Sequence, residues 1–193
     1  MKIVDERIGL EERKILENCI GKELISITHD AFDFNNSVSQ RVQVDVDNSS
    51  FYICNFDRPE DYYGSEEDIP ILSIEKTINL PALEHPVTTP FNRVIKKILI
   101  IQENQRLYEN DKQIYDVWLT RGVLFDFGDG QLAFEKDNWL SSEIFIRRGY
   151  ELLKEFAPED EFMKEEWPDG VRGECSRIIE QIPDVIPKAG KDH

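Results

Sequence analysis

The segment GVLFDFGDGQLAFEKDNW, residues 122–139, constrains the fold of this chain more than any other stretch. Its two arms flank Gly128-Asp129-Gly130 and place apolar residues at every second position, which is the period of a β-strand. Asp-Gly favours a two-residue type I′ turn, so we predict a β-hairpin that turns at Asp129-Gly130. The apolar side chains expected on its buried face are Phe125, Phe127, Leu132 and Phe134, followed further back by Val123, Leu119, Val117 and Tyr115.

The opposite face of this hairpin carries carboxylates. With the predicted turn, Asp126 is diagonal to Glu135 at about 7–8 Å, a separation that one ion can bridge. A hard cation takes six or more oxygen ligands, and two carboxylates on a rigid hairpin supply too few. We therefore interpret this face as a solvated surface rather than a metal site. Gly122 permits either a β-bulge or a second turn.

The other patterns predict one sheet framed by helices. Residues 9–24 have a 3.6-residue apolar period, and Gly21 is suited to end that helix. Residues 80–91 contain three prolines and are expected to wrap an edge of the sheet. Strands are predicted at 23–29, 40–46, 51–56, 70–77, 92–110 and 140–146, with helix as the open alternative at 92–110; helices are predicted at 147–156, within 158–168 and at 174–183.

The length of 193 residues suits one domain, which we place at residues 1–186 with a flexible tail at 187–193. We predict an α+β fold that is largely an antiparallel sheet of about seven to nine strands. One helix is expected at the N-terminus, and further helices at the C-terminus.

The charge balance restricts the class of partner. The chain has 39 acidic and 23 basic residues, a formal net charge of −16. This field repels nucleic acid and anionic membranes, and no basic stripe with interleaved aromatic residues is present. Encounter with a cationic protein would be accelerated. The alternative is that the excess charge only solvates the surface.

The cysteines and the absence of targeting patterns indicate the cellular compartment. Cys19, Cys54 and Cys175 are widely spaced and include no CxxC pair, so we expect reduced residues that fill the core. The first residues lack the pattern of a secretory signal, and no run is long enough for a membrane span. We expect a cytoplasmic protein that is a monomer.

The sequence contains few of the residues and motifs that are typical of enzymes. His29, His85 and His193 are the three histidines, and none belongs to a spaced ligand pattern. No GxSxG, Walker, GxGxxG or HExxH motif occurs. We therefore expect no enzyme activity, no cofactor and no metal. The alternative is a hydrolase or small-ligand protein whose site assembles in three dimensions from Asp126, Glu135 and His29 or His85.

Residues 112–150, which include YDVWLTRGVLFDFGDGQLAFEKDNWLSSEIFIRRG, resemble the small acidic immunity proteins of bacterial polymorphic-toxin and contact-dependent inhibition systems. Many of those proteins carry a late hairpin followed by a charged Lys-Asp-x-Trp segment. Residues of similar type here are Glu135, Lys136, Asp137 and Trp139. The resemblance implies a protein without catalysis that binds and neutralises a cognate toxin domain, often a nuclease.

The leading hypothesis is therefore an acidic protein that covers a basic surface of a toxin domain. Residues 57–70 and 157–170 are predicted as acidic, aromatic loops; aromatic residues supply rigid contact area and carboxylates pair with arginine or lysine. The alternative is that their aromatic side chains pack onto the sheet. The residues predicted to bind the partner are Asp57, Glu60, Asp61, Tyr62, Tyr63, Glu66, Glu67, Asp68, Asp126, Glu135, Asp137 and Trp139.

Overall fold

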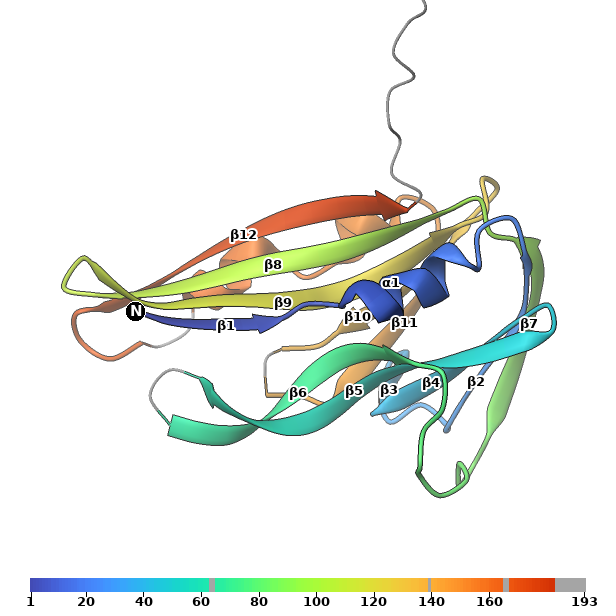
Figure 1. Cartoon of the computed structure of the whole chain (residues 1–193), viewed down its shortest axis with the longest axis horizontal. Coiled ribbons are helices and arrows are strands. Elements are labelled where there is room, and N and C mark those ends of the chain that lie inside the picture. Colours follow the sequence, from blue (N-terminus) through green and yellow to red (C-terminus); the bar gives the residue numbers. More distant parts are fainter. Residues whose placement is uncertain (63–64, 139, 165–166, 183–193) are drawn as a thin grey trace, which may run out of the picture.

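The chain folds into two β-sheets that pack face to face (Figure 1). The computed structural model describes residues 1–62, 65–138, 140–164 and 167–182. In this part of the chain, one sheet has seven strands in the order β12-β8-β9-β10-β11-β3, with β1 added in parallel to β9. Its strands are β1 (Lys2–Glu6), β3 (Ser37–Ser39), β8 (Lys97–Glu109), β9 (Lys112–Asp126), β10 (Gln131–Lys136), β11 (Glu143–Gly149) and β12 (Val171–Ile182).

The second sheet has five antiparallel strands in the order β6-β5-β4-β2-β7. The prediction of a largely antiparallel β protein is confirmed, but the twelve strands of the described residues exceed the expected seven to nine and form two sheets instead of one. The strands of this sheet are β2 (Glu23–His29), β4 (Arg41–Val46), β5 (Ser49–Tyr62), β6 (Ser65–Glu75) and β7 (Val87–Val94).

The main core lies between the sheets because each contributes one apolar face. In β4, Val42, Val44 and Val46 are fully buried while the residues between them are partly exposed. From the seven-stranded sheet, the rings of Phe125 and Phe134 meet edge to face with centroids 5.9 Å apart, a geometry that aromatic quadrupoles favour. Alternation along the strands therefore fixes which side chains form the core.

The N-terminal helix α1 (Leu10–Glu17) is shorter than the 9–24 span predicted. Its side toward the core carries Leu16, which is fully buried. Glu12 fixes its start, since one carboxylate oxygen accepts a hydrogen bond from the Gly9 amide and the other from the Ile74 amide of β6. The helix ends at Glu17, and the chain turns through Gly21, whose φ of 80° suits glycine.

The β9–β10 turn has a different register from the predicted one. Gln131 pairs with Asp126 and Leu132 with Phe125, so residues 127–130 form a four-residue connection instead of a two-residue turn. The shift moves every partner by two positions, and the predicted buried face near the turn is therefore retained. Further back, β9 is irregular opposite Ile101 and Gln102, which confirms the bulge option near Gly122.

The segment 57–70 is predicted as a loop, but its described residues, 57–62 and 65–70, are instead the outer half of the β5–β6 ladder, which pairs without a break from Tyr52↔Glu75 to Tyr62↔Ser65. Pro59 and Pro70 are tolerated there since they lie on the long hairpin near the sheet edge, where fewer amide donors are needed. The proline-rich segment does wrap an edge, because its last residues continue into β7, the edge strand of the five-stranded sheet.

The predicted C-terminal helices were largely wrong. Residues 174–183 were predicted as a helix, but β12 pairs with β8 over twelve residues. Ile178 and Ile179 are both exposed, so this edge strand lacks the alternation that identifies strands. Between β11 and β12 the chain makes only two 3-10 turns, η1 (Leu152–Glu155) and η2 (Glu159–Lys164), which cover the outer face of the seven-stranded sheet.

In the described part of the chain, none of the helices has the length and apolar character required to cross a membrane. The predicted tail, 187–193, lies outside the described residues, as do the last residues of the predicted domain, 183–186.

Candidate functional site

Six of the predicted partner-binding residues come together on the outer half of the β5–β6 hairpin, which we call the acidic hairpin. The hairpin projects at the left end of the molecule in Figure 1. Four of its carboxylate residues are exposed and two are half-buried. The acidic hairpin comprises Asp57, Glu60 and Asp61 on β5, and Glu66, Glu67 and Asp68 on β6.

The register of the acidic hairpin sets like charges opposite one another. Glu60 pairs with Glu67, and the next pair toward the tip is Asp61 with Glu66. Like charges directly opposite in an antiparallel ladder destabilise it, by about 0.2–1 kcal/mol for each pair. Two such pairs in succession therefore oppose formation of the hairpin.

The carboxylate of Glu6, at the end of β1, extends this acidic group. Burial, together with the charge of Glu60 and a hydrogen bond to its side chain, raises the pKa of Glu6 to about 7. Two cations moderate the cluster: Lys2 Nζ is 2.9 Å from Asp61 Oδ2, and Arg58 Nη1 is 3.9 Å from Glu6 Oε2. Removal from water is the main cause of the raised pKa of Glu6, and the neighbouring carboxylate of Glu60 adds to it.

Glu135 is predicted to bind the partner, but its side chain is only 1% exposed and does not lie on the surface. Its carboxylate accepts hydrogen bonds from Arg121 Nε at 3.3 Å and from the Ala157 amide at 2.8 Å, and it is also paired with Arg147. The outer face was expected to be solvated, but η1, η2 and the residues between them cover it. Glu135 therefore holds this cover onto the sheet.

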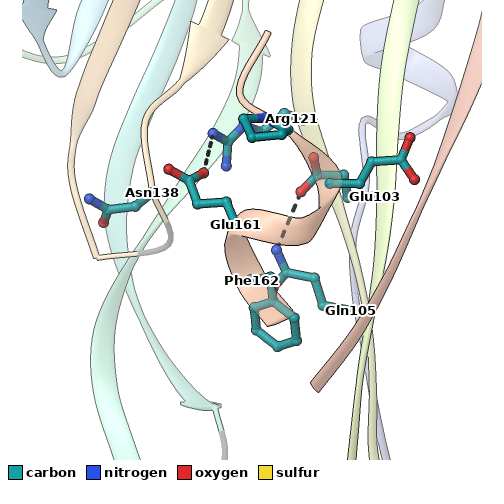
Figure 2. Close-up of a pocket in the computed structure, with 8 residues that line it drawn as sticks. Glu103, Gln105, Arg121, Asn138, Glu161 and Phe162 are labelled. Carbon is teal, nitrogen blue, oxygen red and sulfur yellow. Dashed lines mark hydrogen bonds and ion pairs between the residues drawn. The ribbon is translucent and has the colours of Figure 1, made fainter. Parts of the chain in front are cut away.

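Beside the Arg121–Glu135 ion pair lies a small cavity of about 20 Å³ under η2 (Figure 2). Arg121 Nη2 donates to Glu161 at 3.2 Å, and Gln105 Nε2 donates to Glu103 at 3.3 Å. Glu103 also pairs with Arg177. Such a volume accommodates about one water molecule.

This cavity is lined by carboxylates that arginines neutralise. Across the described residues, no group of three or more histidine, cysteine, aspartate or glutamate side chains is placed to hold a metal ion. A buried ion-pair network of this kind positions η2 against the sheet. Its geometry supports a structural role.

Asp126 was also predicted to bind the partner, but the structure gives it a local role. It accepts hydrogen bonds from the Gly128 amide at 2.7 Å and Gln131 Nε2 at 3.0 Å, and Lys97 Nζ lies 3.4 Å away. Burial raises the pKa of Asp126, and these hydrogen bonds and Lys97 outweigh burial and hold it below its usual range. Asp126 therefore orders the turn that follows β9.

The remaining predicted residues contribute less. Asp137 is half-buried, its amide donates to the Glu143 carbonyl at 3.1 Å, and its carboxylate accepts from Asn138 at 3.3 Å. The Tyr62 side chain, Tyr63 and Trp139 lie outside the described residues.

The alternative enzyme site does not assemble. Glu135 pairs with Gly122 and Asp126 with Gln131, so the two carboxylates are separated along the hairpin and are not diagonal neighbours. His29 is in β2 of the other sheet, where it is 1% exposed and stacks on Phe32. His85 is exposed in the segment before β7. These four residues thus form no common site.

The cysteines are free thiols, as expected. Burial raises the pKa of the Cys19 thiol to about 11 and of the Cys54 and Cys175 thiols to about 12. At neutral pH they are therefore protonated and poor nucleophiles.

Sequence reasoning missed a buried lysine. Lys136 is 3% exposed, its Nζ donates to the Asn138 carbonyl at 2.8 Å, and burial lowers its pKa to about 7. The alternation that placed Leu132 and Phe134 in the core, continued by one step, points Lys136 inward too. That signal was available in the sequence.

Comparison of the chain with protein-family models, with curated proteins and with solved structures finds no significant match.

Proposed function

We propose that this chain binds a cationic surface of a partner protein through the acidic hairpin and neutralises that partner, as an immunity protein neutralises a toxin domain. The observation that carries the proposal is the pairing of Glu60 with Glu67 and of Asp61 with Glu66. Lys2 pairs with Asp61, but like charges directly opposite one another in a ladder still oppose its formation. A partner that inserts lysine or arginine side chains between them removes this repulsion.

The raised pKa of Glu6 supports the same function. A cation placed beside the carboxyl group of Glu6 favours its charged form and lowers its pKa from about 7. Binding of a cationic partner near pH 6 is therefore accompanied by proton release. Its affinity rises as the pH approaches 7 and the carboxyl group of Glu6 ionises.

The net charge of −16 adds a long-range contribution. A strongly negative surface accelerates encounter with a basic partner at low ionic strength. A nuclease domain has such a basic surface, because it must bind phosphates. The exposed carboxylates of the acidic hairpin would occupy that surface in place of nucleic acid.

Two matched variants test the proposal. The hairpin variant E66Q/E67Q/D68N removes three exposed carboxylates from β6. The control variant E17Q/E84Q/E155Q removes three exposed carboxylates elsewhere, so both variants change the net charge equally. Each chain is used to capture proteins from its native host at low and high salt, and the captured protein is then expressed alone and with each chain.

We expect the native chain and the control variant to capture a basic protein that slows growth when expressed alone, and to restore growth on co-expression. The hairpin variant should capture much less of this protein and should fail to restore growth. Equal capture and protection by the hairpin variant, or a captured protein without toxicity, would contradict the proposal.

A further inference from the structure

A second surface, which we call the arginine groove, lies at the other end of the molecule from the acidic hairpin. It is an open groove of about 390 Å³ between β7 of the five-stranded sheet and the β9–β10 turn and the end of β11 of the seven-stranded sheet. In Figure 1 the β9–β10 turn is at the right-hand end, whereas the acidic hairpin is at the left. Asp129 and Gly130 of this turn thus form part of a wall of the groove.

The groove contains two arginines in a chain with a large excess of acid. The guanidinium of Arg148 lies over the ring of Phe91 at 4.8 Å, and among the described residues it contacts no carboxylate or carbonyl oxygen. The other arginines of the described residues have such an oxygen partner, as Arg172 has in Glu174. Partial burial lowers the pKa of Arg148. A partly desolvated guanidinium with no counter-charge is a stronger anion site than one in bulk water.

The second arginine is held in place by the turn. Arg93 Nη1 donates to the Asp129 carbonyl at 3.1 Å. It also lies 3.6 Å from the carboxylate of Asp129, a side chain that is 73% exposed. An ion pair so exposed is weak and can be exchanged for a ligand. A Cβ added at Gly130, where φ is 150°, would lie 2.6 Å from Arg93 Nη1. Glycine at position 130 therefore leaves room for the guanidinium over the turn.

Aromatic side chains form the apolar part of the groove. The rings of Phe91 and Phe127 are 6.2 Å apart with a 37° interplanar angle, and Tyr150, which also lines the groove, is 74% exposed. An exposed tyrosine at the mouth of a groove supplies a large flat contact area at low entropic cost. Guanidinium groups beside ring faces suit a ligand that is both flat and negatively charged.

We propose that the arginine groove binds a small planar anion, namely a carboxylate or phosphate carried on an aromatic ring. The negative group is paired with Arg148 and Arg93, and the ring lies against the exposed ring of Tyr150. This site is separate from the acidic hairpin and does not depend on the partner proposed for it.

The test uses phenyl phosphate and benzoate as probes, with benzylamine and inorganic phosphate for comparison, against the intact chain. Binding is measured by calorimetry and by amide shifts in the NMR spectrum. The variants are R148Q and R93Q, and the matched control is R172Q, which removes another arginine that stacks on an aromatic ring, Tyr108, but is paired with Glu174. Dispersed spectra establish that each variant is folded.

We expect saturable binding of phenyl phosphate or benzoate with shifts at Gly130 and Arg148. Loss of a charge-assisted hydrogen bond should weaken binding about tenfold in R148Q and measurably in R93Q, and leave it unchanged in R172Q. The proposal is overturned by no saturable binding of either probe, by equal binding of benzylamine, or by an equal loss in R172Q. Inorganic phosphate that binds as tightly as phenyl phosphate overturns the role given to the ring.

Discussion

Glu60 of β5 lies directly opposite Glu67 of β6, and Glu60 is also hydrogen-bonded to the side chain of Glu6. Three carboxyl groups from three strands are thus gathered toward the tip of the acidic hairpin. Their mutual repulsion makes this region sensitive to pH, to charge substitution and to cations.

The E6Q substitution should change the pH dependence of stability. The pKa of Glu6 is about 7 in the folded chain and near 4.5 without the fold, so the folded state binds the extra proton between these values. The free energy of unfolding therefore falls as the pH rises from about 4.5 to 7. Urea denaturation across this range should show that E6Q lacks this decline, whereas E17Q, at an exposed position, retains it. Parallel pH profiles for native and E6Q chains would show that Glu6 has an ordinary pKa.

The E60Q substitution should lower the pKa of Glu6. Burial is the main cause of the raised value and remains, but the negative charge of Glu60, which also raises it, is lost. A ¹³C NMR titration of the Glu6 carboxyl group should therefore place its midpoint below that of the native chain but still above 4.5. An unchanged midpoint would mean that the two carboxyl groups do not interact.

Lys136 should make the protein more stable as the pH rises above neutrality. Its pKa is lowered to about 7 by burial, whereas in the unfolded chain it stays near 10.5. The unfolded state therefore binds more protons between these values, and the contribution of Lys136 rises by at most about 1.4 kcal/mol per pH unit. K136M should be more stable than the native chain at pH 6, by an amount that shrinks toward pH 10. The control substitution K164M, at an exposed position, should show no such trend. The same trend in K164M would show that the pH dependence does not come from Lys136.

Removal of the Glu135 carboxylate should be strongly destabilising. E135A leaves Arg121, which is 7% exposed, and Arg147 without this counter-charge, and loss of one partner of a buried ion pair costs about 3–5 kcal/mol. The measurement is the free energy of unfolding in urea, with E155A at an exposed position as the control. A loss below about 1 kcal/mol would indicate that Glu135 is solvated, as the sequence had suggested.

Local patterns predicted the parts of the fold that depend on alternation. β2 was located at its observed residues, 23–29, and the inward face around Phe125 and Phe134 was correct although the turn was misplaced. The error in register was even, and an even shift leaves each side chain on its face.

The failures have a common physical cause, namely tertiary contacts that a local pattern does not contain. The charges and prolines of 57–70 favour a loop, yet the pairing of β5 with β6 continues through them. Glu135 was placed correctly on the outer face, but nothing local reveals that η1, η2 and Ala157 cover it. The sequence thus predicted the carboxylates of the acidic hairpin as a binding surface. It did not predict the arginine groove, which forms where β7 meets the β9–β10 turn.

The most direct test of the proposed function is the association rate of the captured partner with the native chain, the hairpin variant and the control variant as ionic strength increases. We predict that the hairpin variant associates about tenfold more slowly than the native chain at low salt and loses most of the salt dependence, while the control variant keeps both. Equal rates and equal salt dependence for the two variants would contradict the account, because net charge alone would then explain the binding.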